Sequence, residues 1–137
     1  MQIITLGINH NTASVQLREQ LALGEDEIRA TLSSLASAPA TFAFAELVIL
    51  STCNRTELYA VSSHLTIAEL EIFLSETCDV PVNAFRHHVY QYKDMEAARH
   101  LFDVVAGLDS LVIGEPQILG QIVRAIELSR GQNMAGP

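Results

Sequence analysis

The sequence lacks the features that mark most membrane and secreted proteins. No stretch approaches the roughly 18 consecutive apolar residues of a membrane-spanning helix, and no basic segment precedes an apolar one at the start. Only two cysteines are present, Cys53 and Cys78, and they form no Cys-x-x-Cys pair. Because sparse thiols of this kind favour a reducing compartment over a disulfide framework, we expect a cytoplasmic protein without membrane contacts.

Nucleotide and metal motifs are missing as well. The seven glycines never occur as a Gly-x-Gly pair, so neither the dinucleotide-binding fingerprint nor a P-loop is present. His64, His87 and His88 have no metal-ligand partner three or four residues away. This chain is therefore expected to hold no cofactor through those motifs and no metal ion.

Basic residues are scarce. The chain carries eight Lys and Arg residues against sixteen Asp and Glu, which gives a formal net charge of −8. A protein that coats nucleic acid needs a basic face, and this composition does not supply one. Since all but one of the cations are arginines, any contact with an anionic partner must be local and made by arginine.

What the sequence does contain is an alternation of strand and helix patterns. Helical periodicity predicts one helix from Glu25 to Pro39 and another after Thr66, which forms a capping box with Glu69. Apolar and β-branched patterns predict strands at residues 3–8, 47–51, 57–62 and 88–92. The order is βαββαβ. It predicts an α+β, ferredoxin-like unit over residues 1–93, with a four-stranded antiparallel sheet and helices on one face.

Residues 94–137 read as additional C-terminal helices of the same domain. Asp94 is predicted to cap a helix, residues 107–115 interrupt the pattern, and Pro116 suits the first position of a second helix. Gly131 follows that second pattern as a C-cap would. The apolar face of the first of these helices is predicted to carry Met95, Ala98, Leu101, Phe102 and Val105.

Cys53 lies in a polar stretch, with residues 53–56 predicted to form a turn between two strands. A free cysteine is usually buried and inert. Here, however, the site follows a strand end, and Arg55 stands two residues on, where it can favour the nucleophilic thiolate. The residues alone leave two interpretations open, a structural turn and a reactive thiol. Cys78 closes a helix with no cation nearby in sequence and is interpreted as structural.

His100 falls in the first C-terminal helix. Its angular position lies outside the predicted apolar stripe, one turn after Glu96. The pattern alone therefore predicts a solvated helix histidine with a weak i, i+4 partner. A general base must reach its nucleophile in space, which spacing along the chain does not show.

Three long stretches, in this order, make the chain similar to a known family. They are Leu6-Gly-Ile-Asn-His-Asn-Thr-Ala13, Leu50-Ser-Thr-Cys-Asn-Arg-Thr-Glu-Leu-Tyr59 and Gly107-Leu-Asp-Ser-Leu-Val-Ile-Gly-Glu-Pro-Gln-Ile-Leu-Gly-Gln121. The chain resembles the N-terminal catalytic domain of glutamyl-tRNA reductase over nearly its whole length. That family is an NADP-dependent oxidoreductase, which converts glutamyl-tRNA to glutamate 1-semialdehyde through a cysteine thioester. The reaction is the first step of 5-aminolevulinate, heme and other tetrapyrrole synthesis.

The resemblance implies a role for each matched residue. Cys53 corresponds to the nucleophile that forms the thioester, and His100 to the histidine near the thiol that donates or accepts a proton. Arg55 suits the side-chain carboxylate of glutamate through paired hydrogen bonds. The remaining substrate-binding positions that the motifs imply are Thr52, Asn54, Ser110, Glu115, Gln117 and Gln121.

The resemblance also implies parts that this sequence does not contain. Family members continue into a connecting helix, an NADPH-binding domain and a helical dimerisation domain. We therefore expect a truncated chain, with NADPH bound only in the full-length enzyme and no cofactor here. The implied partners are the aminoacyl end of glutamyl-tRNA, a second copy through the absent domain, and glutamate-1-semialdehyde aminomutase as a channelling partner.

The expected activity of this chain alone is thioester formation followed by slow ester hydrolysis. Two alternatives stand beside it. A non-enzymatic ferredoxin-like binding module would explain the missing cofactor motif and the acidic composition. A small thiol esterase would use the same nucleophile on free esters.

Overall fold

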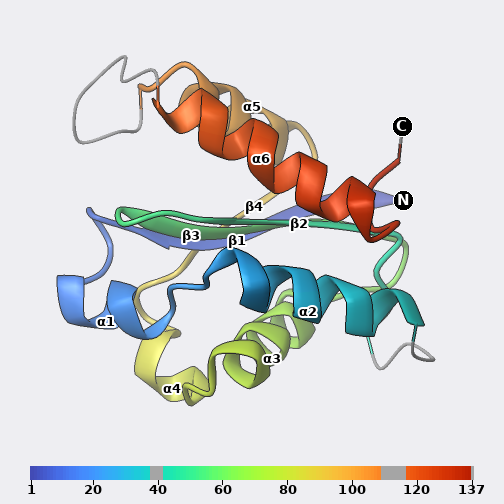
Figure 1. The fold of residues 1–137 in the computed structure, drawn as a ribbon. Helices are drawn as coiled ribbons and strands as arrows, with labels where there is room; N and C mark the ends of the chain where they lie inside the picture. Colours follow the sequence, from blue (N-terminus) through green and yellow to red (C-terminus); the bar gives the residue numbers. More distant parts are fainter. Residues whose placement is uncertain (38–41, 109–116, 137) are drawn as a thin grey trace.

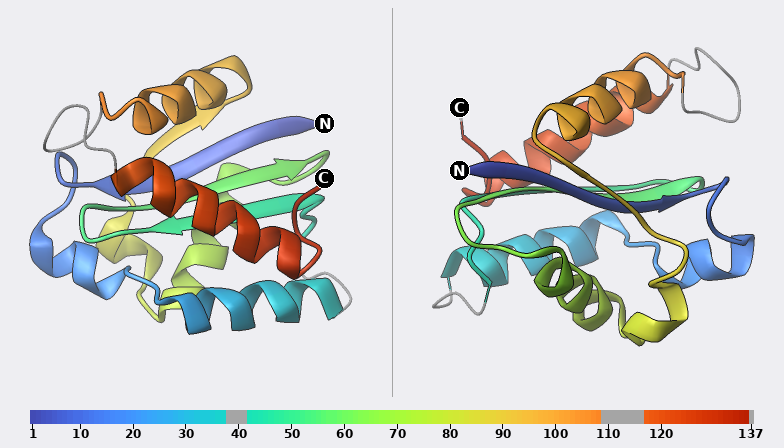
Figure 2. Two further views of the ribbon diagram at one scale, coloured as in Figure 1. Left: turned by 45° about the horizontal axis from the view of Figure 1, so that its top comes forward. Right: turned by 180° about the vertical axis from the view of Figure 1, so that it is seen from behind.

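A four-stranded sheet lies between two layers of helices (Figure 1). The computed structural model describes residues 1–37, 42–108 and 117–136. One face of the sheet is covered by four helices: α1 (Val15–Gln20), α2 (Glu25–Ser37), α3 (Ile67–Cys78) and α4 (Val82–Phe85). The second face is covered by α5 (Met95–Val105) and α6 (Gln117–Gly131), which lie side by side in Figure 2. Both chain ends lie at the same end of the sheet.

Every pair of neighbouring strands in the sheet is antiparallel. The order is β2-β3-β1-β4. The strands are β1 (Gln2–Asn9), β2 (Glu46–Ser51), β3 (Arg55–Ser62) and β4 (Tyr90–Lys93). This confirms the predicted α+β class, with a four-stranded antiparallel sheet and further helices after it. The prediction of helices on one face holds for the chain before β4, because α5 and α6 cover the second face.

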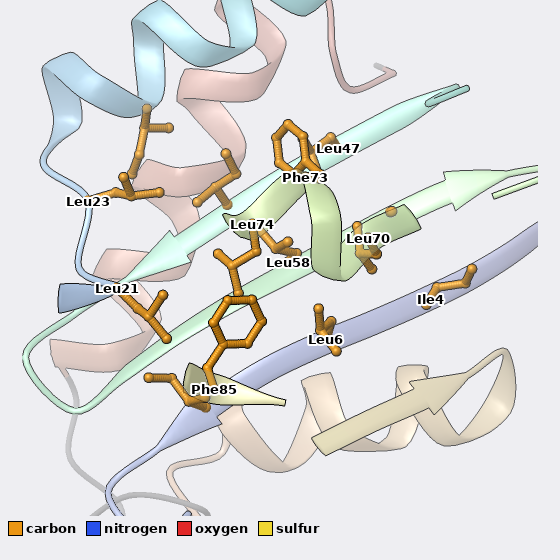
Figure 3. Packing of buried hydrophobic residues seen from close by; sticks show 14 of the residues in the cluster. Ile4, Leu6, Leu21, Leu23, Leu47, Leu58, Leu70, Phe73, Leu74 and Phe85 are labelled. Atoms are coloured by element: carbon orange, nitrogen blue, oxygen red, sulfur yellow. The ribbon is translucent and has the colours of Figure 1, made fainter. Parts of the chain in front are cut away.

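The face beneath α1 to α4 carries the main hydrophobic core (Figure 3). Ile4 and Leu6 of β1 are fully buried there, because alternate strand residues point to the same face. Leu47 and Ile49 of β2 join this core, whereas Leu50 packs against α6 on the other face. The continuous apolar run of β2 is thus covered on both faces, as predicted.

The face beneath α5 is polar. Arg55, Glu57 and Tyr59 alternate along β3, and all three interact on this side of the sheet. The rings of Tyr90 and Tyr92 of β4 contact His100 of α5 there; that of Tyr92 is stacked on it and that of Tyr90 is tilted. A polar sheet face that is covered by a helix must satisfy its own charges, and this requirement shapes the candidate site.

The predicted apolar face of α5 is correct only in part: Leu101 and Val105 are half-buried against the apolar cluster that α5 forms with α6. The helix buries Ala97, His100 and Val104, whereas Met95 and Phe102 are 79% and 72% exposed. The reason lies in the sheet: α5 packs on the polar strand residues of β1 and β4, so the face that carries His100 turns inward. The helix therefore has two different neighbours: the apolar side chains of α6, which Leu101, Val104 and Val105 contact, and the polar sheet face, toward which His100 turns.

Asp94 precedes α5 but does not cap it. Its carboxylate accepts a hydrogen bond from the backbone N–H of Ile3 at 3.0 Å, and it makes no side-chain bond to the helix. Its φ of 49° turns the chain sharply from β4 into α5. The Asp94 side chain therefore does not form the predicted cap; it links β1 to the turn between β4 and α5.

Helix ends elsewhere follow the sequence closely. The hydroxyl of Thr66 accepts from the N–H of Glu69, whose carboxylate accepts from the N–H of Thr66, so the predicted capping box is confirmed. α2 begins at Glu25 and α6 ends at Gly131, which lies inside the helix rather than beyond it. Pro39 and Pro116, predicted to end and begin helices, lie outside the described residues.

The strand boundaries differ from prediction by one or two residues, and one short helix was not predicted. β3 begins at Arg55, so the turn after β2 is shorter than residues 53–56. β4 covers Tyr90–Lys93 rather than residues 88–92. The four-residue helix α4 was not predicted, because a single turn is too short to show helical periodicity.

Candidate active site

Cys53 lies at the tip of the β2–β3 hairpin and is exposed. Thr52 holds the turn closed: its N–H donates to the carbonyl of Arg55 at 2.8 Å. Its hydroxyl accepts from the N–H groups of Asn54 and Arg55, each at 3.2 Å. A hydroxyl that bonds nearby backbone groups favours a tight turn over a continued strand. The local sequence therefore presents the thiol at the sheet edge.

A cavity of about 50 Å³ opens beside the thiol. Hairpin residues form one wall and the start of α6 forms the other, although they are more than sixty positions apart in the sequence. The described residues that line it are Thr52, Cys53, Asn54, Arg55, Gln117, Ile118 and Gln121. The fold thus brings together six of the nine site residues that the sequence predicted. Ser110 and Glu115 lie outside the described residues.

Arg18 of α1 contacts the same hairpin. Its Nη1 donates to the backbone carbonyl of Cys53 at 3.3 Å and to the side-chain oxygen of Asn54 at 3.5 Å. Its Nε is buried and has no acceptor among the described residues. Sequence reasoning missed this residue, since Arg18 lies 35 positions before Cys53 and no local pattern links them. It places a second guanidinium at the thiol-bearing turn.

Arg55 is buried, with only 2% of the residue exposed. Its Nη1 donates to Oε2 of Glu57 at 3.4 Å. The two residues are two apart on one strand and therefore share a face of the sheet. A guanidinium can enter a protein interior only with an anionic partner, and Glu57 supplies it. Arg55 is thus an ordered part of the wall beside Cys53.

Glu57 is fully buried and has four polar partners. Besides Arg55, it accepts hydrogen bonds from Tyr59 at 2.8 Å and Tyr90 at 2.5 Å, and it contacts Nε2 of His100. Burial acts to raise the pKa of the Glu57 carboxyl, but the His100 contact, the Arg55 charge and the Tyr90 hydroxyl outweigh it. The pKa therefore lies below its ordinary value, and the carboxylate is ionised.

Tyr90 shows the reverse effect. Burial, together with the charge and the hydrogen bond of Glu57, raises the pKa of the Tyr90 hydroxyl far above its ordinary value. The phenol therefore remains a proton donor to the carboxylate over the whole physiological range. Glu57 and Tyr90 reach each other from β3 and β4, which are separated by β1.

His100 is buried, so the solvated histidine predicted from the helical pattern is wrong. Only 8% of it is exposed, and its ring stacks on Tyr92 with centroids 4.7 Å apart. It borders a second cavity of about 330 Å³, which Tyr92, Glu96, Arg99 and Asp103 also line. Among the described residues, His100 does not line the cavity that contains Cys53. The contacts Arg55–Glu57 and Glu57–His100 connect the cavity beside Cys53 to His100 at the second cavity.

Glu57 and the tyrosines around it were not predicted as site residues. One signal was present: Glu57 is an acidic residue at the start of a predicted strand, directly after the polar turn at Cys53. Acidic residues are rarely buried without partners, so such a position calls for a cation nearby. What the sequence did not show is which partners arrive there, because Tyr90 and His100 come from later elements.

The described residues offer no dinucleotide or metal site. They contain no group of three His, Cys, Asp or Glu side chains placed to hold a metal ion. The antiparallel sheet, in the part of the chain that the structure describes, has no strand–glycine-rich turn–helix unit, so NADPH does not fit it in that manner. None of the described helices has the length and apolarity needed to cross a bilayer.

Comparisons with known proteins agree on one family. The family model described as "Glutamyl-tRNAGlu reductase, N-terminal domain" matches residues 6–137. The chain is 45% identical, over 130 residues, to the glutamyl-tRNA reductase of Chromohalobacter salexigens, in a match that covers 95% of this chain and 30% of that protein. It is 41% identical over 137 residues to that of Acinetobacter baumannii, where all of this chain matches 31% of the relative.

A solved structure is similar as well. The glutamyl-tRNA reductase from Methanopyrus kandleri matches with a TM-score of 0.74 and 25% identity. The match covers 98% of this chain and 29% of the solved one. The chain thus spans about 30% of the length of the proteins that it resembles.

Proposed function

The chain belongs to the glutamyl-tRNA reductase family as its N-terminal domain, and from this premise we propose that Cys53 accepts the glutamyl group of glutamyl-tRNA. The observation that carries the proposal is the cavity beside the exposed thiol, which gathers Arg55, Gln117 and Gln121 from distant parts of the chain. An exposed thiol next to polar recognition groups suits nucleophilic attack on an activated carbonyl.

The proposed step is a transesterification. The Cys53 thiolate attacks the carbonyl carbon of the glutamyl ester and forms a C–S bond. The C–O bond to the terminal ribose breaks, and the ribose oxygen takes up the proton that the thiol has lost. Water can then add to the thioester, release glutamate and restore the thiol. This second, slow reaction is the ester hydrolysis expected of this chain alone.

Arg55 is proposed to bind the side-chain carboxylate of the glutamyl group. It presents a fixed positive charge at the cavity wall, and guanidinium groups match carboxylates geometrically. Gln117 and Gln121, one helical turn apart on α6, face the same cavity and can hydrogen-bond the rest of the amino acid. Thr52 and Asn54 are proposed to hold the turn and line the pocket. Roles for Ser110 and Glu115 rest on the motif match.

His100 is proposed to donate or accept a proton, on the strength of the resemblance to the family. Its Nε2 contacts Glu57, so proton exchange with the thiol or the ribose oxygen uses Nδ1 or follows release of that contact. The general acid must lie within hydrogen-bond reach during the reaction.

The complete protein is proposed to be an NADPH-dependent oxidoreductase that makes glutamate 1-semialdehyde for tetrapyrrole synthesis. Because the described residues contain no strand–glycine-rich turn–helix unit for NADPH, no hydride step is assigned to them. Dimerisation through a further domain, contact with glutamate-1-semialdehyde aminomutase and a cytoplasmic location are proposals of the same kind. So are the ferredoxin-like description of residues 1–93 and the assignment of 94–137 to the same domain. The strand order and the antiparallel pairing support the ferredoxin-like description.

The test is to trap the acyl group on the protein. Incubation with radiolabelled glutamyl-tRNA, followed by acid quenching, should leave label on the wild-type chain and on Cys78→Ser, but none on Cys53→Ser. Cys78 is the matched control, because burial raises the pKa of its thiol to about 11 and keeps it unreactive. Label on Cys53→Ser at the wild-type level would refute the nucleophile assignment. Label from simple glutamate esters at the same rate would favour the thiol esterase alternative.

A further inference from the structure

One buried carboxylate, that of Glu57, contacts both Arg55, the proposed ligand of the substrate carboxylate, and His100, the proposed proton donor or acceptor. Oε2 of Glu57 accepts from Nη1 of Arg55 and contacts Nε2 of His100. The same oxygen accepts from the hydroxyl of Tyr90, while Oε1 accepts from Tyr59. All the partners point at a side chain with no exposed surface.

The contact between Glu57 and Tyr90 depends on a residue without a side chain in β1, Gly7. Gly7 lies opposite Glu57 on one side and Tyr90 on the other. A Cβ at this position would stand 2.8 Å from Cγ of Glu57 and 3.1 Å from the Tyr90 hydroxyl. The glycine therefore leaves a slot across the central strand, through which Glu57 reaches β4 and α5.

Stability alone does not account for this arrangement. A buried ionic cluster is often no more stabilising than apolar residues of the same volume, because its charges lose their hydration. On the other face of the sheet, this chain builds its core from apolar side chains. The polar cluster occupies the face where Arg55 leads to the Cys53 cavity and His100 borders the second cavity.

We propose that Glu57 is a positioning residue, which fixes the Arg55 guanidinium at the wall of the Cys53 cavity and ties it to His100. The inference rests on the proposed function and deepens it. Glu57 touches neither the thiol nor the cavity; it acts through its two partners. Because Arg55 shares one carboxylate with His100, a substrate carboxylate that binds Arg55 weakens the Arg55–Glu57 pair and leaves Glu57 more fully to His100. Substrate recognition and the histidine are thereby coupled through a single oxygen atom.

Glu57→Gln tests the proposal, since the amide keeps the shape and removes the charge. The measurement is single-turnover formation of the Cys53 thioester, with glutamyl-tRNA and with glutaminyl-tRNA, whose side chain carries no charge. We expect the rate with glutamyl-tRNA to fall about 10- to 100-fold, as for a misplaced binding group, and the preference over glutaminyl-tRNA to shrink. Glu57→Asp keeps the charge but cannot span all four partners, and it should show the same loss.

Glu71→Gln is the matched control. Glu71 of α3 is also a buried carboxylate, 7% exposed, and Nε of Arg86 lies 3.4 Å from it, the distance of the Arg55–Glu57 pair. It belongs to the helical layer on the opposite face of the sheet. Its substitution should lower thermal stability and leave both the thioester rate and the substrate preference unchanged.

A double-mutant cycle separates positioning from a purely structural role. If Glu57 acts through Arg55, then Glu57→Gln should slow Arg55→Gln little further, because the group to be positioned is already gone. The same should hold in the His100→Asn background. The proposal would be overturned if Glu57→Gln slowed thioester formation by the same factor in the wild-type, Arg55→Gln and His100→Asn chains and left the preference for glutamyl-tRNA unchanged. A wild-type chain that forms no Cys53-dependent thioester would instead refute the proposed function, and the positioning role with it.

Discussion

Gly7→Ala is the smallest change that should disrupt the polar cluster. The added methyl group would stand 2.8 Å from Cγ of Glu57 and 3.0 Å from the backbone carbonyl of Thr56. Ordinary van der Waals contacts of a Cβ lie at 3.4–4 Å, so one of the neighbours must move by roughly half an ångström. The backbone of β3 cannot move without distorting its hydrogen bonds to β1. The Glu57 side chain cannot move without weakening its hydrogen bonds to Tyr59 and Tyr90.

The magnitude follows from overpacking. Forcing a methyl group into a filled interior costs about 1–3 kcal/mol. For 137 residues, the entropy of unfolding is about 0.29 kcal/mol per kelvin, so this cost lowers the midpoint of thermal unfolding by about 3–10 °C. The direction is opposite to that expected at an open strand position, where alanine is favoured over glycine by about 0.5–1 kcal/mol.

Gly120→Ala provides the control for the same chemical change. Gly120 is exposed on α6, and nothing beyond its own helix backbone and its chain neighbours lies within 4 Å of the place where a Cβ would stand. Alanine there should raise stability by about 0.5–1 kcal/mol, since glycine is a poor helix residue. Thermal unfolding followed by circular dichroism should thus move in opposite directions for the two variants. Gly7→Ala with a midpoint at or above that of the wild type would refute the slot in β1.

Two further predictions concern the thiol-bearing turn and the buried carboxylate. Arg18→Gln should slow thioester formation by about 2- to 10-fold, the equivalent of one net hydrogen bond, while Arg29→Gln, which breaks only an exposed ion pair with Asp26, should not. Thioester formation by Arg18→Gln at the wild-type rate would contradict a role for Arg18 in holding the Cys53 turn. The depressed pKa of Glu57 contributes stability that is present above its ordinary value of 4.5 and is lost as pH falls through the folded value. As the pH falls below about 4.5, the unfolding midpoint of Glu57→Gln should therefore fall less with acid than that of the wild type; parallel curves would contradict this.

Two arginines show where an acidic chain could bind an anionic partner locally. With a net charge of −8, the chain has no general surface for nucleic acid, but Arg18 and Arg55 both stand at the Cys53 hairpin. Arg55 is compensated by Glu57, whereas Arg18 faces backbone and amide oxygens. These two guanidinium groups support the proposal that the site binds a local anionic group, the glutamyl carboxylate.

Local patterns were sufficient for most of the elements. The apolar run of β2, the capping box of α3 and the helix of residues 117–131 depend on neighbours in the chain, so they could be predicted from the sequence. The polar turn at Cys53 was visible for the same reason. Its chemistry was not, since the pattern left a reactive thiol and a plain turn equally open until the motifs were compared.

The sequence by itself determined the α+β class, the positions of the strands and the family-specific motifs around Cys53. Only the tertiary structure decided that Arg55 and His100 are buried and that Glu57 joins them. The physical reason is that the period of a helix describes how it packs on an apolar surface, whereas the side of α5 that carries His100 packs on the polar face of the sheet. Which residues turn inward there depends on charges that β1, β3 and β4 bring together, and that pairing exists only once the sheet has formed.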